Sequence, residues 1–155
     1  MDYLNLIAWL VAVSSGLMAG TYFAFSSFIM QSLKALDGLG GIRTMNSINK
    51  VILRSMFMPL FFGSTILALA LAGGGLWIWG EPDALWATAA GSIYVIGMFG
   101  VTAVFNVPLN NALAIAENNS NAAQVWTQYL TVWTRWNSVR AVTSLITCVA
   151  CTKLL

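Results

Sequence analysis

The sequence predicts an all-α integral membrane protein, a single domain over residues 1–155 in which four transmembrane helices form a bundle. Of its 155 residues, 59% are hydrophobic and only 8% are charged, against roughly 25% charged in an ordinary soluble domain. Its charges are separated by stretches longer than the ~20 residues that cross a hydrocarbon core. It also has seven tryptophans, and their apolar ring with a polar N–H suits a membrane interface.

The first helix is expected to stay in the mature protein as a membrane span. Asp2 stands where a signal peptide would carry positive charge, and no small-residue cleavage site follows a short apolar core. Long stretches without charged residues mark the spans. The predicted helices lie near Leu4–Leu33, Met56–Trp79, Ala84–Phe105 and Val125–Thr152.

The connections between these helices also carry signals. Gly80–Asp83 reads Gly-Glu-Pro-Asp, a tight turn that would make the second and third helices antiparallel neighbours. Pro108 has no N–H and disfavours the helical conformation at Val107, so we expect the third helix to end at Phe105. Asn121 closes a polar loop and is a suitable N-cap for the last helix.

Loop charge predicts the orientation. The loop after the first helix carries an excess of positive charge, and the second loop carries only Glu81 and Asp83. Positively charged loops stay in the cytoplasm. We therefore expect a cytoplasmic (inner) membrane location with both termini extracytoplasmic. The cations of the first loop are Lys34, Arg43, Lys50 and Arg54.

Arg140 is the most informative residue of the fourth helix. Fifteen residues follow it, which is about 22 Å of helix, whereas the hydrocarbon core is ~30 Å thick. None of the predicted helices holds an acidic residue to pair with it, and Glu117 is the one acid that could approach from the same side. An ionisable residue inside a membrane is a functional candidate.

The neighbours of Arg140 predict a polar pocket at the cytoplasmic end of the bundle. Trp133, Asn137 and Arg140 share one helix face, and Trp136 lies four residues before Arg140. Arg140, Asn137 and Asn106 are the candidate catalytic residues. The candidate substrate-binding residues are Trp133, Trp136, Asn110, Asn111 and Asn49, with Asn46 close by. In the alternative interpretation Arg140 only extends to lipid phosphate, the asparagines cap helices and the tryptophans form an interfacial belt.

The sequence contains no histidine, which removes the commonest metal ligand and the usual base at neutral pH. We expect no metal and no cofactor. Without histidine, Glu117 or solvent would have to accept a proton. The expected partners are the lipid bilayer and a small aromatic ligand, and a homo-oligomer stays open. Nucleic acid is not expected, because the net charge is only +2 and no basic run is present.

Two stretches, Phe105-Asn-Val-Pro-Leu-Asn-Asn111 and Trp133-Thr-Arg-Trp-Asn-Ser-Val-Arg140, resemble the anthrone oxygenase-like family, as do Gly20–Ser26 and Met45–Asn49. The resemblance implies a small membrane protein, and for some members it implies oxidation of an anthrone to an anthraquinone by O₂ without a bound cofactor. Ser138 stands where the resemblance implies histidine in many members.

Two functions therefore remain open from the sequence. The first is a cofactor-independent oxygenase acting on a lipophilic phenolic or quinone-like compound, with Arg140 and the asparagines as donors to a developing oxyanion. The second is a non-enzymatic membrane protein that binds a lipid, a quinone or a partner helix. A proton-accepting group that reaches the pocket would distinguish the two.

Overall fold

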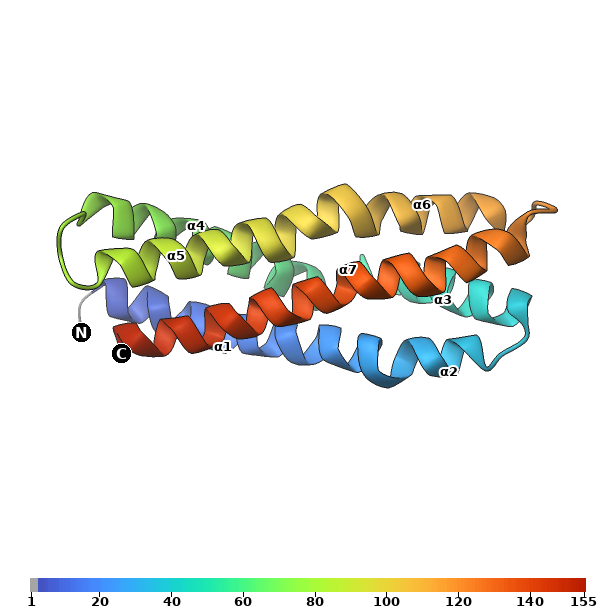
Figure 1. The fold of residues 1–155 in the computed structure, drawn as a ribbon, viewed down its shortest axis with the longest axis horizontal. Helices are drawn as coiled ribbons and strands as arrows, with labels where there is room; N and C mark the ends of the chain where they lie inside the picture. Colours follow the sequence, from blue (N-terminus) through green and yellow to red (C-terminus); the bar gives the residue numbers. More distant parts are fainter. Residues whose placement is uncertain (1–2) are drawn as a thin grey trace.

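The computed structural model describes residues 3–155, so Asp2 lies outside the described residues. The prediction of an all-α fold is confirmed, since every regular element of the described chain is helical (Figure 1). The first rod consists of α1 (Tyr3–Ala24), η1 (Phe25–Ile29) and α2 (Met30–Lys34), and the second of α3 (Gly38–Ile52) and α4 (Phe57–Trp77). The third consists of α5 (Ala84–Tyr94), η2 (Val95–Gly100), η3 (Thr102–Asn106) and α6 (Val107–Ala116), and the fourth of α7 (Ala122–Cys151) and η4 (Thr152–Leu154).

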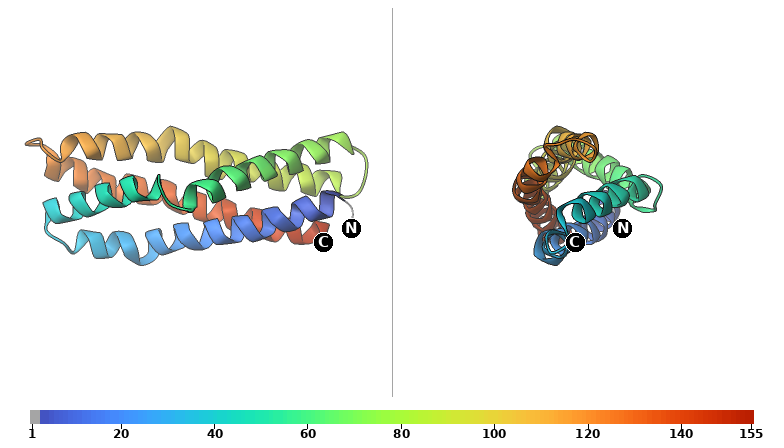
Figure 2. Two further views of the ribbon diagram at one scale, coloured as in Figure 1. Left: turned by 180° about the vertical axis from the view of Figure 1, so that it is seen from behind. Right: turned by 90° about the vertical axis from the view of Figure 1, so that its right-hand side faces the viewer.

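The four rods lie side by side in alternating directions (Figures 1 and 2). The beginning of α1, the α4–α5 turn and the end of α7 share one end of the molecule. At that turn Gly80 has a φ of 106°, a left-handed conformation that glycine adopts without steric cost. The expected antiparallel packing of the second and third predicted helices is thus present as α4 against α5.

Three of the described helices are long and apolar enough to cross a membrane: Tyr3–Lys34, Phe57–Trp77 and Ala84–Ala116. This supports a membrane protein, but the fourth predicted span, α7, is not among the three. Its exposed face changes character at Arg135. The exposed residues before that position include Gln124, Thr127, Gln128 and Thr131, and those after it include Val142, Leu145, Ile146 and Val149.

The prediction that the third helix ends at Phe105 is wrong, because the rod continues through Pro108 to Ala116. Val107 keeps helical angles, with φ −64° and ψ −47°, and its N–H donates to the carbonyl oxygen of Thr102 across a π-helical turn. Pro108 then occupies the first turn of α6, where its missing N–H is not needed. The widened turn of η3 absorbs the change of hydrogen-bond register that Pro108 imposes.

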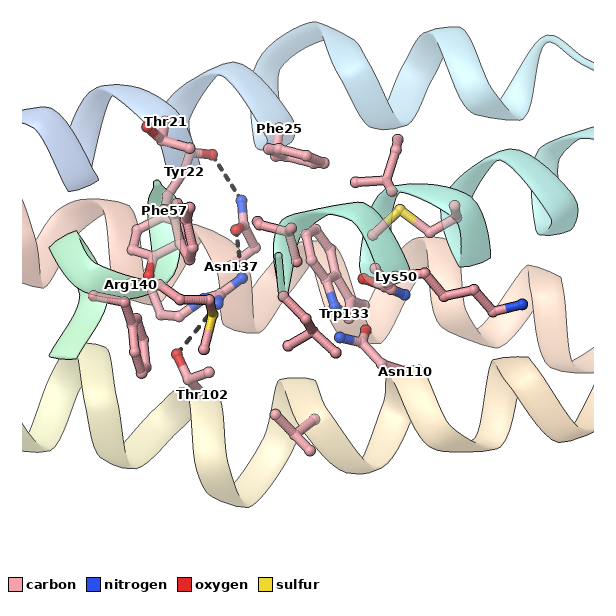
Figure 3. Close-up of a pocket in the computed structure, with 18 of the residues that line it drawn as sticks. Thr21, Tyr22, Phe25, Lys50, Phe57, Thr102, Asn110, Trp133, Asn137 and Arg140 are labelled. Carbon is pink, nitrogen blue, oxygen red and sulfur yellow. Dashed lines mark hydrogen bonds between the residues drawn. The ribbon is translucent and has the colours of Figure 1, made fainter. Parts of the chain in front are cut away.

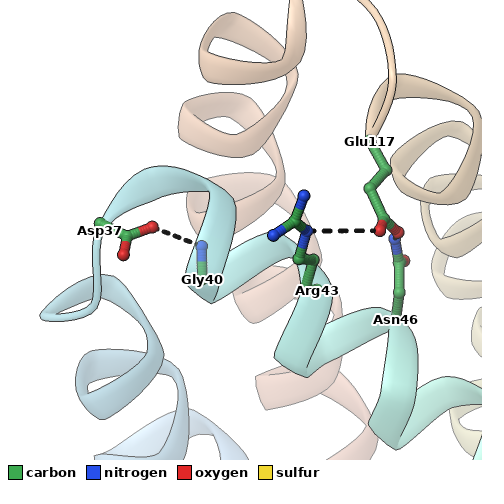
Figure 4. Close-up of polar contacts among 5 residues, drawn as sticks. All are labelled: Asp37, Gly40, Arg43, Asn46 and Glu117. Carbon is green, nitrogen blue, oxygen red and sulfur yellow. Dashed lines mark hydrogen bonds and ion pairs between the residues drawn. The ribbon is translucent and has the colours of Figure 1, made fainter.

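The loop expected after the first helix is instead largely helical, as α3. Asp37 caps α3, and its carboxylate accepts the N–H of Gly40 at 2.6 Å (Figure 4). Buried side chains on one face of α3, such as Ile42 and Met45, pack against α2, α6 and α7. A short irregular stretch, residues 53–56, separates α3 from α4. Since α3 and α4 are not one continuous helix, the second rod bends beside the centre of the molecule (Figure 2).

The rods pack differently at their two ends. Near the termini small side chains fill the core, among them Ala8, Ala87 and Ala90, and we call this region the tight half. At the other end, which we call the cavity half, the core is built from large side chains on α2, α3, α6 and α7. Those side chains include Met30, Leu33, Met45, Leu113, Trp126, Tyr129 and Trp133.

Candidate functional site

A cavity of about 460 Å³ lies where α1, α3, α4, α6 and α7 meet, with Arg140 at one end and Lys50 at the other (Figure 3). Its apolar walls combine aromatic and aliphatic side chains, and its polar residues are mostly amides. The aromatic lining residues are Tyr22, Phe25, Phe57, Phe61, Phe62, Phe99 and Trp133. The polar ones are Thr21, Asn46, Asn49, Lys50, Thr102, Asn110, Asn111, Asn137 and Arg140.

Arg140 is buried, with 6% of its surface exposed, and its partners among residues 3–155 are all neutral. Its Nη2 donates to Oδ1 of Asn137 at 2.7 Å, and its Nη1 donates to Oγ1 of Thr102 at 3.2 Å. The guanidinium carbon lies 4.2 Å from the ring centroid of Tyr22 and 5.4 Å from that of Trp133. Both rings therefore offer the cation their negative faces.

Asn137 fixes the orientation of this cation. Its Nδ2 donates to the carbonyl oxygen of Tyr22 at 2.7 Å and to Oγ of Ser26 at 2.6 Å. Because both amide protons are used by α1 and η1, the amide oxygen is left to face the guanidinium of Arg140. The contact between the first and fourth rods thus sets the direction in which Arg140 points.

Three π-helical turns surround the cavity, and each contributes to its wall. Phe25 comes from η1, Phe99 from η2 and Thr102 from η3. A π-helical turn widens the helix and shifts the following side chains, and such turns are frequent at functional sites. In this chain Thr102 follows the widened turn of η2, and its hydroxyl oxygen accepts a hydrogen bond from Arg140.

The other end of the cavity is lined by amides from α3 and α6. Asn110 accepts the Tyr129 hydroxyl at 2.7 Å. Four buried polar atoms of lining residues have no hydrogen-bond partner among residues 3–155. One is Nε of Arg140, and the other three are Oδ1 of Asn46, Nδ2 of Asn49 and Nε1 of Trp133. Unpaired buried groups are rare in native structures, so this end has bonds to offer to a ligand or to water.

Glu117 lies outside the cavity lining, although the sequence predicts that it is the one acid able to approach Arg140 from the same side. Its Oε2 accepts Nδ2 of Asn46 at 2.7 Å, and its Oε1 lies 3.8 Å from Nε of Arg43 (Figure 4). It therefore joins α6 to α3. Asn46 stands between this carboxylate and the cavity.

Two of the candidate residues take other positions. Asn106 is buried outside the lining, where its Nδ2 donates to the carbonyl oxygen of Trp133 at 3.3 Å. Trp136 does not form a wall, because its ring stacks on Phe105 outside the lining, with centroids 3.6 Å apart and planes 7° apart. The other candidates, namely Arg140, Asn137, Trp133, Asn110, Asn111 and Asn49, all line the cavity.

Ser138 also lies away from the cavity. Its hydroxyl is 2.9 Å from Oγ of Ser26 and donates to the carbonyl oxygen of Thr134 at 2.9 Å. The position is thus part of the contact between the first and fourth rods. The histidine that the resemblance implies for other members is replaced here at a position outside the cavity lining.

Sequence reasoning missed the residues that reach the site from the other rods. Tyr22 and Thr102 both touch Arg140. Tyr22 lies within Gly20–Ser26, but nothing in that segment or around Thr102 indicates that the two residues meet Arg140. Phe57 and Phe61 lie four residues apart, a spacing that favours ordinary packing, and both line the cavity. The one available signal was a polar-tipped aromatic residue, Tyr22, deep in a long apolar stretch.

Among the residues that the structure describes, no group of three or more His, Cys, Asp or Glu side chains is arranged to hold a metal ion. The described lining of the cavity likewise contains no carboxylate. What this lining supplies is amide groups, the guanidinium of Arg140, the ammonium of Lys50 and aromatic faces. Such a set can hold a flat apolar molecule and stabilise negative charge on one of its oxygens.

Comparison with known proteins assigns the family. A family model described as anthrone oxygenase matches residues 50–150, about two thirds of the chain, including Asn110, Trp133 and Arg140. No curated protein and no solved structure matches the chain. The family that the two sequence motifs predicted is therefore confirmed, and this chain belongs to the anthrone oxygenase family.

Proposed function

We propose that this protein is a membrane-embedded, cofactor-independent oxygenase that oxidises a lipophilic phenol- or quinone-like aromatic compound in the cavity. One observation carries the proposal: a buried guanidinium, Arg140, is held by neutral groups beside Tyr22 and Trp133 in an aromatic cavity. A buried charge is normally paired. A ligand oxygen bearing negative charge would provide the missing partner.

We also propose that all four rods span the membrane. The part of α7 after Arg135 exposes apolar side chains, and the helix from Arg135 to Lys153 is about 27 Å long. That length agrees with a hydrocarbon core of ~30 Å. The polar half of α7 then protrudes together with α3, whose cations favour the cytoplasmic side. Both termini would be extracytoplasmic.

This topology has a direct test. In a Cys148→Ala, Cys151→Ala background, a cysteine at Asp83 should react with a membrane-impermeant reagent in intact cells. A cysteine at Arg43 should react only after the cells are opened, because it would lie on the cytoplasmic side. Labelling of Arg43 alone in intact cells would invert the topology.

The chemistry requires little from the protein beyond binding and electrostatics. An anthrone has an acidic CH₂ conjugated to its ketone, and loss of one proton gives an electron-rich enolate. The enolate transfers an electron to O₂, and the superoxide combines with the ring carbon to give a peroxide anion. Protonation and loss of water form the second carbonyl, so that anthrone and O₂ give anthraquinone and water. Arg140 would stabilise the enolate oxygen as a hydrogen-bond donor, and the aromatic side chains of the lining would hold the rings.

Oxygen uptake with an anthrone tests the proposal. Wild-type protein should exceed the uncatalysed rate at the same pH. Arg140→Met should lower that excess by ten- to a hundredfold, because a charge-assisted hydrogen bond contributes about 1.5–3 kcal/mol. Arg135→Met is the matched control, since Arg135 is exposed on another face of the same helix. Equal rates for the two variants would exclude the proposed role of Arg140.

A non-enzymatic binding protein is the second candidate, and one observation favours it. The described cavity lining holds neither carboxylate nor histidine, which are the commonest general bases. Under this alternative the protein would bind a quinone or phenol tightly, and oxygen uptake would stay at the uncatalysed rate. A measurement of ligand binding beside the measurement of oxygen uptake separates the two functions.

A further inference from the structure

We infer that the cavity takes its aromatic ligand as an oxyanion, with the ionised oxygen against Arg140, and that binding lowers the pKa of the ligand. This inference rests on the proposed function, because it assumes that an aromatic ligand enters the cavity. It goes further by naming the ionisation state of the ligand. It also assigns to the protein the role of acidifying the substrate, in place of a general base.

The charges that face the cavity carry the first step. The fourth rod contributes Arg140 and the second contributes Lys50. The titratable residue of the first rod is Tyr22, which is neutral and whose hydroxyl donates to Sδ of Met98. Tyr129 points its hydroxyl to Asn110 beside the cavity. No described residue of the third or second rod adds a carboxylate to the lining, so the described side chains make the cavity positive at neutral pH.

The nearest acid cannot compensate this charge, because it is already engaged. Glu117 binds Arg43 and Asn46, and this is the single ion pair found within residues 3–155. Arg140 by contrast is bound by an amide oxygen, a hydroxyl and two ring faces. Neutral acceptors leave the net charge in place. An anionic oxygen is the ligand group that removes it.

The unpartnered atoms around the cavity carry the second step. Nε of Arg140, Nε1 of Trp133 and Nδ2 of Asn49 are donors without partners among the described residues, and Oδ1 of Asn46 is the corresponding acceptor. An excess of donors fits a ligand that presents oxygens as acceptors. The ligand class is therefore a flat aromatic with an ionisable hydroxyl or enolisable ketone near Arg140 and a second oxygen toward Trp133 and Asn49.

The sign of the pKa change distinguishes this site from an apolar pocket. Burial away from water disfavours an ionised phenol and raises its pKa, whereas a cation within hydrogen-bond distance favours the ionised form and lowers it. For an anthrone, stabilisation of the enolate by the cation makes the CH₂ group more acidic. The bond breaks heterolytically, its electron pair moves into the enolate, and the proton passes to water.

The experiment is a pH titration of a coloured probe, 2-hydroxyanthraquinone, whose ionised and neutral forms absorb at different wavelengths. The full chain is kept in detergent, and the reference is the probe in the same micelles without protein. We expect the pKa of the bound probe to lie at least one unit below the reference, which means that the anion binds at least tenfold more tightly than the neutral form. Arg140→Lys should keep part of the decrease, and Arg140→Met should turn it into an increase.

Lys50→Gln is the matched control, because Lys50 is the other cation of the lining and lies at the opposite end (Figure 3). It should keep most of the decrease. A bound probe whose pKa is unchanged or raised in the wild type overturns this inference and leaves ligand binding intact. A decrease that Lys50→Gln abolishes and Arg140→Lys leaves whole overturns the assignment to Arg140. Failure of the probe to bind at any pH overturns the proposed function with it.

Discussion

The tight half and the cavity half are built from the same four rods, yet one is filled and the other is hollow. In the tight half Gly91 lets α5 approach α4 so closely that a Cβ there would meet the backbone oxygen of Ala68. In the cavity half aromatic side chains and the break between α3 and α4 hold the rods apart. The comparison teaches that side-chain size at the rod contacts decides where a cavity forms.

Polarity follows the same division. In the tight half and the adjoining centre, hydroxyl groups such as those of Tyr94 and Thr147 have partners within the core, at Ser64 and Ala90. In the cavity half several amide and indole groups have none among the described residues. The first region leaves two buried hydroxyls without a partner among the described residues, those of Thr88 and Ser144, whereas the second leaves amide, indole and guanidinium groups unpartnered around one cavity. A ligand is the simplest partner for those groups.

The largest effect on stability is expected from Gly91→Ala. Its Cβ would lie 2.7 Å from the backbone nitrogen of Ala72 and closer still to the Ala68 oxygen, so α4 and α5 must separate. Overpacking of this kind lowers the free energy of unfolding by about 1–3 kcal/mol. The measurement is thermal unfolding in detergent.

Gly73→Ala is the control for that substitution, because nothing lies within 4 Å of a Cβ at this position. Replacing a helical glycine by alanine at an open site should raise the free energy of unfolding by about 0.5–1 kcal/mol. If the two variants unfold at the same temperature, the close approach of α5 to α4 does not stabilise the tight half.

Much of the fold and part of the site could be predicted from sequence. Uncharged stretches marked the long helices, and the helical period placed Trp133, Asn137 and Arg140 on one face. That face does line the cavity. These signals are local, because they depend on residues of a single helix. The orientation of Asn106 and Trp136 could not be predicted in this way, because each contacts a residue of another rod. Asn106 donates to the carbonyl oxygen of Trp133, and Trp136 stacks on Phe105.

The errors also have physical causes. A proline such as Pro108 normally disrupts a helix. Here the turn before it widens to the π-helical η3, in which the N–H of Val107 donates to the carbonyl oxygen of Thr102, and the helix continues. The charges of the stretch that forms α3 predict an exposed loop. It folds because Asp37 caps it and its apolar face is buried against the other rods. Tyr22 and Thr102 reach Arg140 from two other rods, and no spacing within one segment reveals such a meeting.

The smallest effect is expected at Trp136, and it sharpens the boundary between the cavity and its surroundings. Trp136 belongs to the same motif as Trp133, but its ring stacks on Phe105 and does not line the cavity. Trp136→Leu should lower the free energy of unfolding by about 0.5–1.5 kcal/mol, the contribution of an aromatic pair. It should leave the affinity for 2-hydroxyanthraquinone within twofold of the wild type. Trp133→Leu, the matched variant, removes a cavity wall, a free indole N–H and one ring over Arg140, so the affinity should decrease by at least tenfold. Fluorescence titration of both variants measures this difference, and a larger loss for Trp136→Leu than for Trp133→Leu would show that the ligand binds outside the cavity.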